Sequence, residues 1–410
     1  MALFPALTST LLYCALCFTG AIPILAWRHL RPAHPSALRL GVMLALIAGA
    51  TLGAWLETRS PITFFLPAVM VLAVLVARLR LRDFTHEGLL FLASYIAMVV
   101  SFVTWGFGFL LTIPVSPMTR GFLLAGFPLL MITLPSGLLQ SVTDLEVLCR
   151  SSVGRFVVRG GPTRRARYPK VSLHVPAYSE PPELVIATLD ALAALDYPNY
   201  EVLVIDNNTR DQALWRPVER HCERLGPTFR FYHLEQWPGA KAGALNFALG
   251  VTAKDAEVIG VVDADYLADP DFLSHLIGHF DDPRMGFVQT PHDYRDWEDS
   301  LYLRMCYWEY RYFFASTMVT LDRHDAALTV GTMCLIRRRA LEEAGGWSEW
   351  CVTEDSELAI RIHACGYDSV YLPTTFGRAL FVAFIQCLIY LVLTATLLVT
   401  VYLVLGPTKF

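Results

Sequence analysis

The stretch VSLHVPAYSEPPELVIATLDALAALDYPNYEVLVIDNN, residues 171–208, decides how the second half of the chain folds. Its ends, VSLHVPAY and YEVLVIDNN, are apolar runs with the length of buried strands. Between them, PELVIATLDALAAL places apolar residues at helical spacing, and Pro182 stands where a helix would begin. A strand, a helix and a strand in this order predict a parallel β-α-β unit.

The same alternation continues downstream. FRFYHLEQ and VIGVVDAD predict two further strands, and GAKAGALNFALG predicts a loop and a helix between them. We therefore expect residues 171–378 to form an α/β domain with a doubly wound, Rossmann-like, mainly parallel sheet. Ligands of such sheets bind at the carboxyl ends of the strands, so the candidate site should lie there.

The first third of the chain is typical of a membrane protein. Of the 410 residues, 54% are hydrophobic and only 17% are charged, and the net charge of −4 indicates no nucleic-acid partner. A bilayer-spanning helix needs about 20 mostly apolar residues. The stretches that meet this requirement loosely are 4–26, 38–56, 62–77, 88–112, 121–140 and 379–405.

These stretches predict the domain organisation. We expect an N-terminal transmembrane region of about five helices over 1–140, a basic juxtamembrane linker over 141–170, the α/β domain over 171–378 and a C-terminal transmembrane helix over 379–405. Basic residues follow the first, third and fifth spans, namely Arg28 and Arg31, then Arg78, Arg80 and Arg82, then the run in 150–170. The positive-inside rule predicts a multi-pass protein of the cell (inner) membrane with a cytoplasmic α/β domain. The basic linker would face anionic lipid of the bilayer.

Acidic residues follow the predicted strands. VLVID ends at Asp206, and GVVDAD ends at Asp263 and Asp265. An acid after a strand can simply cap a turn, which stays open for Asp206. Asp263 and Asp265 are two apart on an extended chain, so both carboxylates can face one cation. Mg²⁺ and Mn²⁺ take such oxygen ligands and are often shared with substrate phosphates.

Two further motifs carry candidate residues. WCVTEDSELAIR places Glu354 and Asp355 just before an amphipathic helix. An acid there can merely favour the helix start, whereas Asp355 beside a metal site could act as a general base. GAKAGALN places Lys241 in a small-residue loop that opens a helix, which suits a phosphate, although a surface lysine is the alternative. The sequence has no Walker A or G-x-G-x-x-G pattern, so neither an ATPase nor a dehydrogenase is indicated.

The order of these motifs resembles a known family. The series is HVPAYSEPP (174–182), VIDNNT (204–209), GAKAGALN (239–246), VVDADY (261–266), FVQTPHDY (287–294), VGTMCLIRR (330–338) and VTEDSELAIR (352–361). It is similar to membrane-embedded family 2 glycosyltransferases, the cellulose synthase-like and bacterial β-glucan synthase-like enzymes. The resemblance implies a GT-A fold and inverting transfer of a sugar, with glucose expected, from a UDP-sugar donor to a growing β-glucan-type polysaccharide.

The resemblance also implies roles for individual residues. The nucleotide-sugar group comprises Tyr178, Glu180, Asp206, Lys241 and Asp263. The metal group, for Mg²⁺ or Mn²⁺, comprises Asp265 and Asp263. The acceptor group comprises Gln289, Thr290, Pro291, Gly331, Thr332 and Glu354. Asp355 is the implied catalytic base, which accepts the proton of the glycan hydroxyl while the cation neutralises the leaving diphosphate.

The segment after Asp355 departs from the family pattern. Family members carry a Q-x-x-R-W motif there, which is not found between Asp355 and residue 410. An alternative hypothesis is therefore a truncated, catalytically weak paralogue that binds a nucleotide sugar or helps to assemble a polysaccharide synthase. A third hypothesis is a transferase that adds one sugar to a lipid carrier. The match of Gln289, Thr290 and Pro291 to the family's acceptor element disfavours it. Other synthase or export subunits are expected partners.

Overall fold

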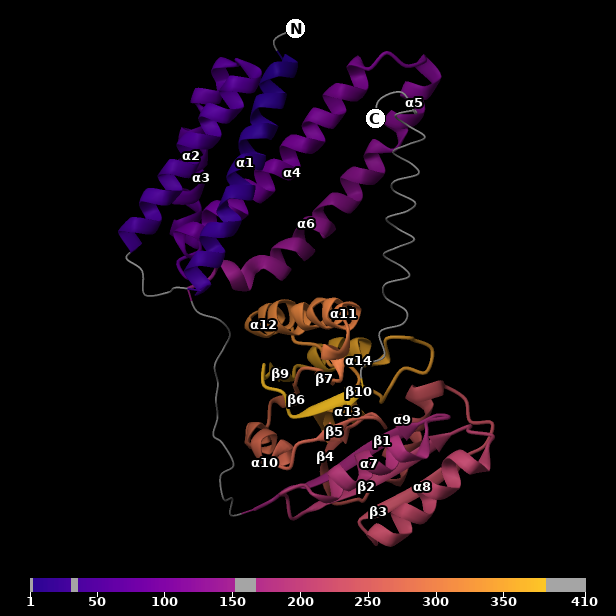
Figure 1. Ribbon diagram of the computed structural model, residues 1–410. Coiled ribbons are helices and arrows are strands. Elements are labelled where there is room, and N and C mark those ends of the chain that lie inside the picture. Colours follow the sequence, from indigo (N-terminus) through magenta and orange to yellow (C-terminus); the bar gives the residue numbers. More distant parts are fainter. Residues whose placement is uncertain (1–2, 31–35, 152–166, 381–410) are drawn as a thin grey trace. The chain divides into compact units, whose positions relative to one another are not determined.

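The computed structural model describes residues 3–30, 36–151 and 167–380. The chain forms two compact units, residues 1–154 and 155–410. The described part of the first is helical, and that of the second combines helices with sheets (Figure 1).

Apolar helices make up the first unit. Its elements are α1 (Leu3–Leu30), α2 (Ser36–Thr58), η1 (Pro61–Phe64), α3 (Leu66–Arg80), α4 (His86–Thr112), α5 (Pro117–Ala125) and α6 (Phe127–Cys149). Within the described residues, five helical stretches are long and apolar enough to cross a membrane: Phe4–Arg28, Ala37–Thr58, Pro61–Arg80, His86–Thr112 and Pro117–Cys149. Each overlaps one of the five spans expected before residue 141. The sixth, 379–405, falls outside the described residues except for 379 and 380, which end a strand.

Charged side chains join the ends of these helices. The buried carboxylate of Glu87 on α4 accepts from Arg39 of α2 at 2.8 Å. Arg28 of α1 donates to the backbone carbonyls of Leu148 and Arg150 at 3.3 and 2.6 Å, and so reaches the end of α6. A buried charge is costly unless it is paired, so these contacts favour one arrangement of the four helices.

The second unit is built on a seven-stranded sheet. Its first half contains β1 (Lys170–Ala177), α7 (Pro182–Ala193), β2 (Tyr200–Asn207), α8 (Gln212–Leu225), β3 (Phe229–Leu234), α9 (Ala240–Val251) and β4 (Ala256–Val261). The strand order is β3-β2-β1-β4-β8-β6-β9, and a smaller sheet has the order β5-β10-β7. In the larger sheet β8 runs antiparallel to β4 and β6, and the other pairs are parallel. The predicted mainly parallel α/β fold is confirmed.

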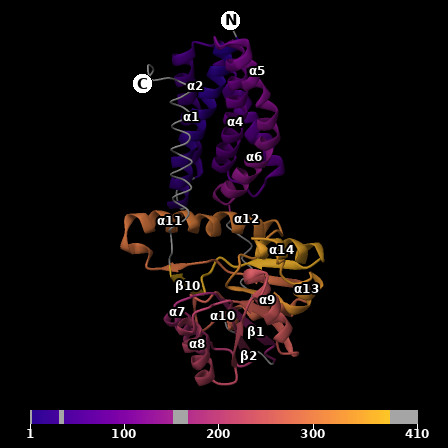
Figure 2. The same ribbon diagram turned by 90° about the vertical axis from the view of Figure 1, so that its right-hand side faces the viewer.

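The second half of this unit adds shorter elements. They are β5 (Leu267–Ala268), α10 (Phe272–Leu276), η2 (Ile277–Asp281), β6 (Met285–Gln289), β7 (Tyr294–Arg295), η3 (Trp297–Asp299), α11 (Leu301–Tyr312), η4 (Phe313–Thr317), α12 (Met318–Arg323), β8 (Cys334–Arg337), α13 (Arg338–Glu343), α14 (Glu354–Ala364), β9 (Asp368–Tyr371) and β10 (Gly377–Leu380). A single π-helical turn, η4, joins α11 to α12, and the three form one rod along this unit (Figure 2). Single π turns of this kind often accompany functional sites.

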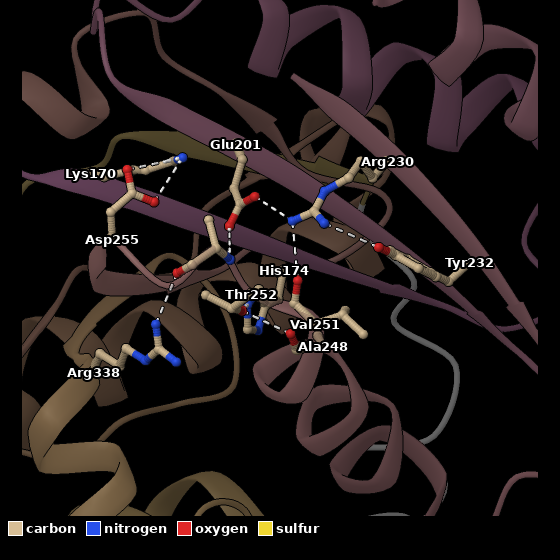
Figure 3. Close-up of polar contacts among 11 residues, drawn as sticks. Lys170, His174, Glu201, Arg230, Tyr232, Ala248, Val251, Thr252, Asp255 and Arg338 are labelled. Carbon is tan, nitrogen blue, oxygen red and sulfur yellow. Dashed lines mark hydrogen bonds and ion pairs between the residues drawn. The ribbon is translucent and has the colours of Figure 1, made fainter. Parts of the chain in front are cut away.

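A polar network anchors the end of α9 to the sheet (Figure 3). The buried carboxylate of Glu201 on β2 accepts from the Ala253 backbone N–H at 2.8 Å and from Arg230 of β3. His174 of β1 is fully buried, and its Nε2 lies 2.9 Å from Thr252 Oγ1. Burial, with a smaller effect of Arg338, lowers the pKa of His174 to about 3, so this imidazole is neutral near pH 7 and serves structure. These bonds hold the chain at the end of α9, so the first turn of this helix has a fixed position at the other end of the sheet.

Candidate functional site

Two adjoining cavities lie at the carboxyl ends of the parallel strands. The first, of about 1020 Å³, is lined by the loops after β1 and β2 and by the end of β3. The second, of about 590 Å³, is lined by the end of β1, the start of α9 and the residues after β4. Tyr178 and Asn208 line both, so the two cavities form one continuous depression. This is the edge at which the sequence predicts a ligand.

Asp206 is the penultimate residue of β2, with only 4% of its surface exposed, and its neighbours Thr209 and His233 line the first cavity. Its Oδ1 accepts from Thr209 Oγ1 and its Oδ2 is bonded to His233 Nδ1, both at 2.6 Å. Burial raises the pKa of Asp206, and these two hydrogen bonds oppose the rise. The His233 ring stacks on Trp215 of α8, with centroids 4.2 Å apart. No motif in the sequence points to His233, although this residue occupies on β3 the position that Asp206 occupies on β2.

Tyr178 and Glu180 lie in the loop after β1. The Tyr178 ring is 65% exposed and borders both cavities, so it is free to stack on a planar ligand. Glu180 lines the second cavity with Asp263 and Asp265. Burial, and then the charges of Asp265 and Asp263, raise the pKa of Glu180. The negative charges of this cavity are therefore incompletely balanced by the protein itself.

Lys241 lies in the first turn of α9, where the sequence predicts it. Its Nζ donates to Asp263 Oδ1 at 2.5 Å and to the Gly331 carbonyl at 3.0 Å. Burial alone would lower the pKa of Lys241, but the Asp263 carboxylate raises it above its ordinary value. A charged lysine at the start of a helix is suited to a phosphate group, and its contact with a diphosphate stays a prediction.

Gly331 is the point where Lys241 and Asp355 approach each other. Its φ of +81° is in the left-handed region, and a Cβ there would lie 3.1 Å from Asp355 Oδ2 and 3.5 Å from Lys241 Nζ. Asp355 Oδ1 accepts from the Ser356 backbone N–H at 2.6 Å, which fixes the carboxylate at the start of α14. The structure thus brings together Asp263 and Asp355, which are far apart in the sequence.

Several residues of the predicted acceptor group are buried and hydrogen-bonded to the protein backbone. Gln289 and Thr290 are fully buried. Gln289 Nε2 donates to the Thr332 carbonyl at 2.9 Å, and Thr290 Oγ1 donates to the Met333 carbonyl at 2.8 Å. The Thr332 hydroxyl in turn accepts from the Asp263 backbone N–H at 2.9 Å. These side chains hold the loop of Gly331 in place, and contact with an acceptor stays a prediction for them.

The two remaining acceptor residues have different surroundings. Pro291 follows Thr290 and is buried. Glu354 begins α14, and burial raises its pKa, while the Lys241 charge opposes the rise. Its position fits the alternative in which an acid favours a helix start, and a role at the acceptor stays a prediction.

The metal group can supply only part of a cation's ligands. In the described ranges, no set of three or more His, Cys, Asp or Glu side chains is close enough to hold a metal ion. Burial and the neighbouring Asp263 raise the pKa of Asp265, and the charges of Lys241 and Arg295 offset this rise only in part. Mg²⁺ is commonly bound by one or two carboxylates together with substrate phosphates and water. Asp265 and Asp263 fit a cation shared with a diphosphate.

Comparison with known proteins places this arrangement in a family. The model of "Glycosyltransferase like family 2" matches residues 169–389, more than half of the chain. The chain belongs to this family. The cellulose synthase catalytic subunit [UDP-forming] of Pseudomonas fluorescens is 32% identical over 226 residues, which cover 53% of this chain and 29% of the relative. Glucomannan 4-beta-mannosyltransferase 1 of Cyamopsis tetragonoloba is 28% identical over 230 residues, which cover 52% and 43%. The chain thus spans less than half of each relative.

A mannosyltransferase from Pyrobaculum calidifontis, solved in complex with GDP-Man and Mn²⁺, is 25% identical with a TM-score of 0.41, over 53% of this chain and 58% of that one. The family match confirms the expected class, a family 2 glycosyltransferase related to cellulose and glucomannan synthases, with a GT-A-like α/β domain after apolar helices. The roles of single residues and the domain boundaries stay predictions.

Proposed function

We propose that this protein transfers a hexose, glucose in the first instance, from a UDP-sugar to a growing β-glucan-type polysaccharide at the inner membrane. The observation that supports this most directly is the convergence of Lys241, Asp263 and Asp355 around Gly331. A cation for the diphosphate and a carboxylate for the acceptor hydroxyl are the groups that inverting transfer needs.

The donor would lie along the continuous depression, with its base in the first cavity and its diphosphate in the second. Lys241 would exchange part of its bond with Asp263 for a bond to the diphosphate, and so stabilise the negative charge that develops when the sugar leaves. Asp265 and Asp263 would hold Mg²⁺ or Mn²⁺, which supplies further neutralisation of the leaving group.

The acceptor hydroxyl would lose its proton to Asp355. The carboxylate is fixed by the Ser356 backbone N–H, and the Thr329 hydroxyl donates to the Asp355 backbone carbonyl at 2.6 Å. One base is sufficient for inversion, because the hydroxyl attacks the anomeric carbon directly and no covalent sugar–enzyme intermediate forms.

The orientation in the membrane is part of the proposal. The five apolar helical stretches support a multi-pass membrane protein, and the arginines that follow the first, third and fifth spans support a cytoplasmic α/β unit. Nucleotide sugars would then reach the site from the cytosol, and the bilayer is the expected partner of the helical unit.

Transfer assays on purified membranes test the proposal. Labelled UDP-glucose and GDP-mannose are supplied separately with Mg²⁺ or Mn²⁺, beside an Asp355→Asn control. We expect transfer from UDP-glucose that depends on the cation and is lost in the control. Label incorporation no greater than in the control, with every donor and cation, would rule out the transferase role. UDP binding retained in that case would favour the alternative, a nucleotide-sugar-binding or assembly subunit of a polysaccharide synthase.

A further inference from the structure

His233 occupies a special position in the sheet. Strands β2 and β3 are parallel neighbours, and their register pairs Asp206 directly with His233. Both residues therefore reach the carboxyl edge side by side, and the bond between His233 Nδ1 and Asp206 Oδ2 is 2.6 Å long. No role at the site is assigned to His233 by the sequence motifs.

The imidazole ring is fixed in its plane. It stacks on Trp215 at an interplanar angle of 15°, and its side chain is only 16% exposed. With Nδ1 bonded to Asp206, the remaining polar atom is Nε2, and His233 is among the residues that line the first cavity. The only charged partner of Nε2 in the described residues is the exposed Glu235, 3.7 Å away. Nε2 is therefore free to make a bond to a ligand.

The chemistry of this pair matches the edge of a nucleobase. An ionised carboxylate only accepts hydrogen bonds, so in this pair the Nδ1–H of His233 donates to Asp206. In the neutral ring with its hydrogen on Nδ1, Nε2 carries a lone pair and accepts a hydrogen bond. A base with a ring N–H, such as uracil, supplies that donor. Uracil has a carbonyl on both sides of its N–H, whereas cytosine has an amino group and no N–H in the ring at that position.

We propose that His233 determines the base specificity of the donor site: its Nδ1 positions Asp206, and its Nε2 selects a base that has a ring N–H, as in uracil, over one that has none there, as in cytosine. This inference rests on the proposed function and deepens it. It concerns binding of the base, so it leaves the diphosphate and the reacting hydroxyl to other residues.

Two substitutions test the roles of the two ring nitrogens of His233 separately. His233→Asn keeps an N–H near Nδ1 for Asp206 and removes the group at Nε2. His233→Gln places an amide near Nε2. The matched control is His221→Asn, because His221 on α8 forms a similar pair with Asp190 at 2.7 Å and lines neither cavity.

The test measures UDP, CDP and GDP binding to the full-length protein in detergent with Mn²⁺ by calorimetry, together with transfer kinetics. We expect His233→Asn to weaken UDP binding about tenfold, the effect of one lost hydrogen bond, and to reduce the UDP-to-CDP affinity ratio by a similar factor. KM for the donor should rise while kcat at saturation stays within about threefold of wild type. His233→Gln should recover part of the ratio, and His221→Asn should leave it unchanged.

Several results would overturn the inference. If His233→Asn keeps the wild-type UDP-to-CDP ratio, His233 only braces Asp206. If His233→Asn does not fold, a His233→Phe protein, which keeps a ring against Trp215 without ring nitrogens, leads to the same conclusion when its affinities for all three nucleotides are unchanged. Tighter binding of GDP than UDP by the wild type would contradict the assignment of uracil. If the wild type binds none of the three, the proposed function itself fails.

Discussion

Replacing Gly331 by alanine tests whether the geometry around Asp355 controls the reaction. The substitution has two separate effects. An L-residue at φ +81° costs roughly 1–2 kcal/mol of folding free energy, which corresponds to a fall in melting temperature of roughly 2–8 °C for a domain of this size. The new methyl group also lies 3.1 Å from Asp355 Oδ2, so the carboxylate must shift by a few tenths of an ångström.

The second effect should appear in turnover. Because a displacement of 1 Å at a reacting group costs about a hundredfold in rate, a shift of a few tenths should lower kcat roughly tenfold. Nucleotide binding should change much less, since the cavity for the base is lined by other residues. Thermal unfolding, UDP titration and initial rates of transfer measure the three quantities on one preparation.

Gly226 provides the matched control. Its φ of +93° is also positive, but nothing lies within 4 Å of a Cβ added there. Because its ψ of −169° belongs to a region almost restricted to glycine, Gly226→Ala should lower the melting temperature at least as much as Gly331→Ala and leave turnover unchanged. If Gly331→Ala loses stability as Gly226→Ala does and still turns over at the wild-type rate, the position of Asp355 is not critical and the reasoning is refuted.

Further substitutions separate the roles of the charged groups. Asp355→Asn should reduce transfer by about 10²–10⁴-fold with UDP affinity unchanged, because an amide cannot accept the proton; loss of UDP binding would contradict a role as base. Lys241→Gln should raise the donor KM at least about tenfold in initial-rate assays, since a hydrogen bond to a charged group contributes about 1.5–3 kcal/mol, and an unchanged KM would exclude contact with the diphosphate. Asp265→Asn should abolish the response of UDP binding to Mn²⁺ and yet raise the melting temperature near neutral pH. Burial and Asp263 raise the pKa of Asp265. The contribution of Asp265 to folding stability is therefore present below the ordinary pKa of aspartate and is lost as pH rises through the raised pKa. Asparagine carries no charge at any pH, so the variant does not suffer this loss near neutral pH. Burial and the charges of Asp265 and Asp263 also raise the pKa of Glu180. As pH falls, metal-dependent UDP binding should therefore weaken at a higher pH than the ordinary pKa of a carboxylate predicts, and calorimetry at several pH values checks this.

The strands and helices around the site could be predicted from local pattern. The structure confirms the β-α-β alternation, the acid near the end of β2 and the lysine that opens α9, whereas β4 ends at Val261, so Asp263 and Asp265 follow the strand and do not end it. Each of these signals depends on residues within a few positions of one another, because the periods of strands and helices and the preferences at their ends are local properties.

Other features depended on tertiary structure. The burial of Gln289 beneath the Gly331 loop follows from the insertion of antiparallel β8 between β4 and β6, which no local pattern indicates. The pairing of His233 with Asp206 required the register of β2 and β3.

The sequence by itself therefore determined the classes of element, the apolar helical region and which types of side chain stand at strand ends. Only the tertiary structure decided which of those side chains meet. The physical reason is that strand order and register bring together residues far apart in the chain, as with Lys241, Asp263 and Asp355, and such contacts depend on how whole elements pack.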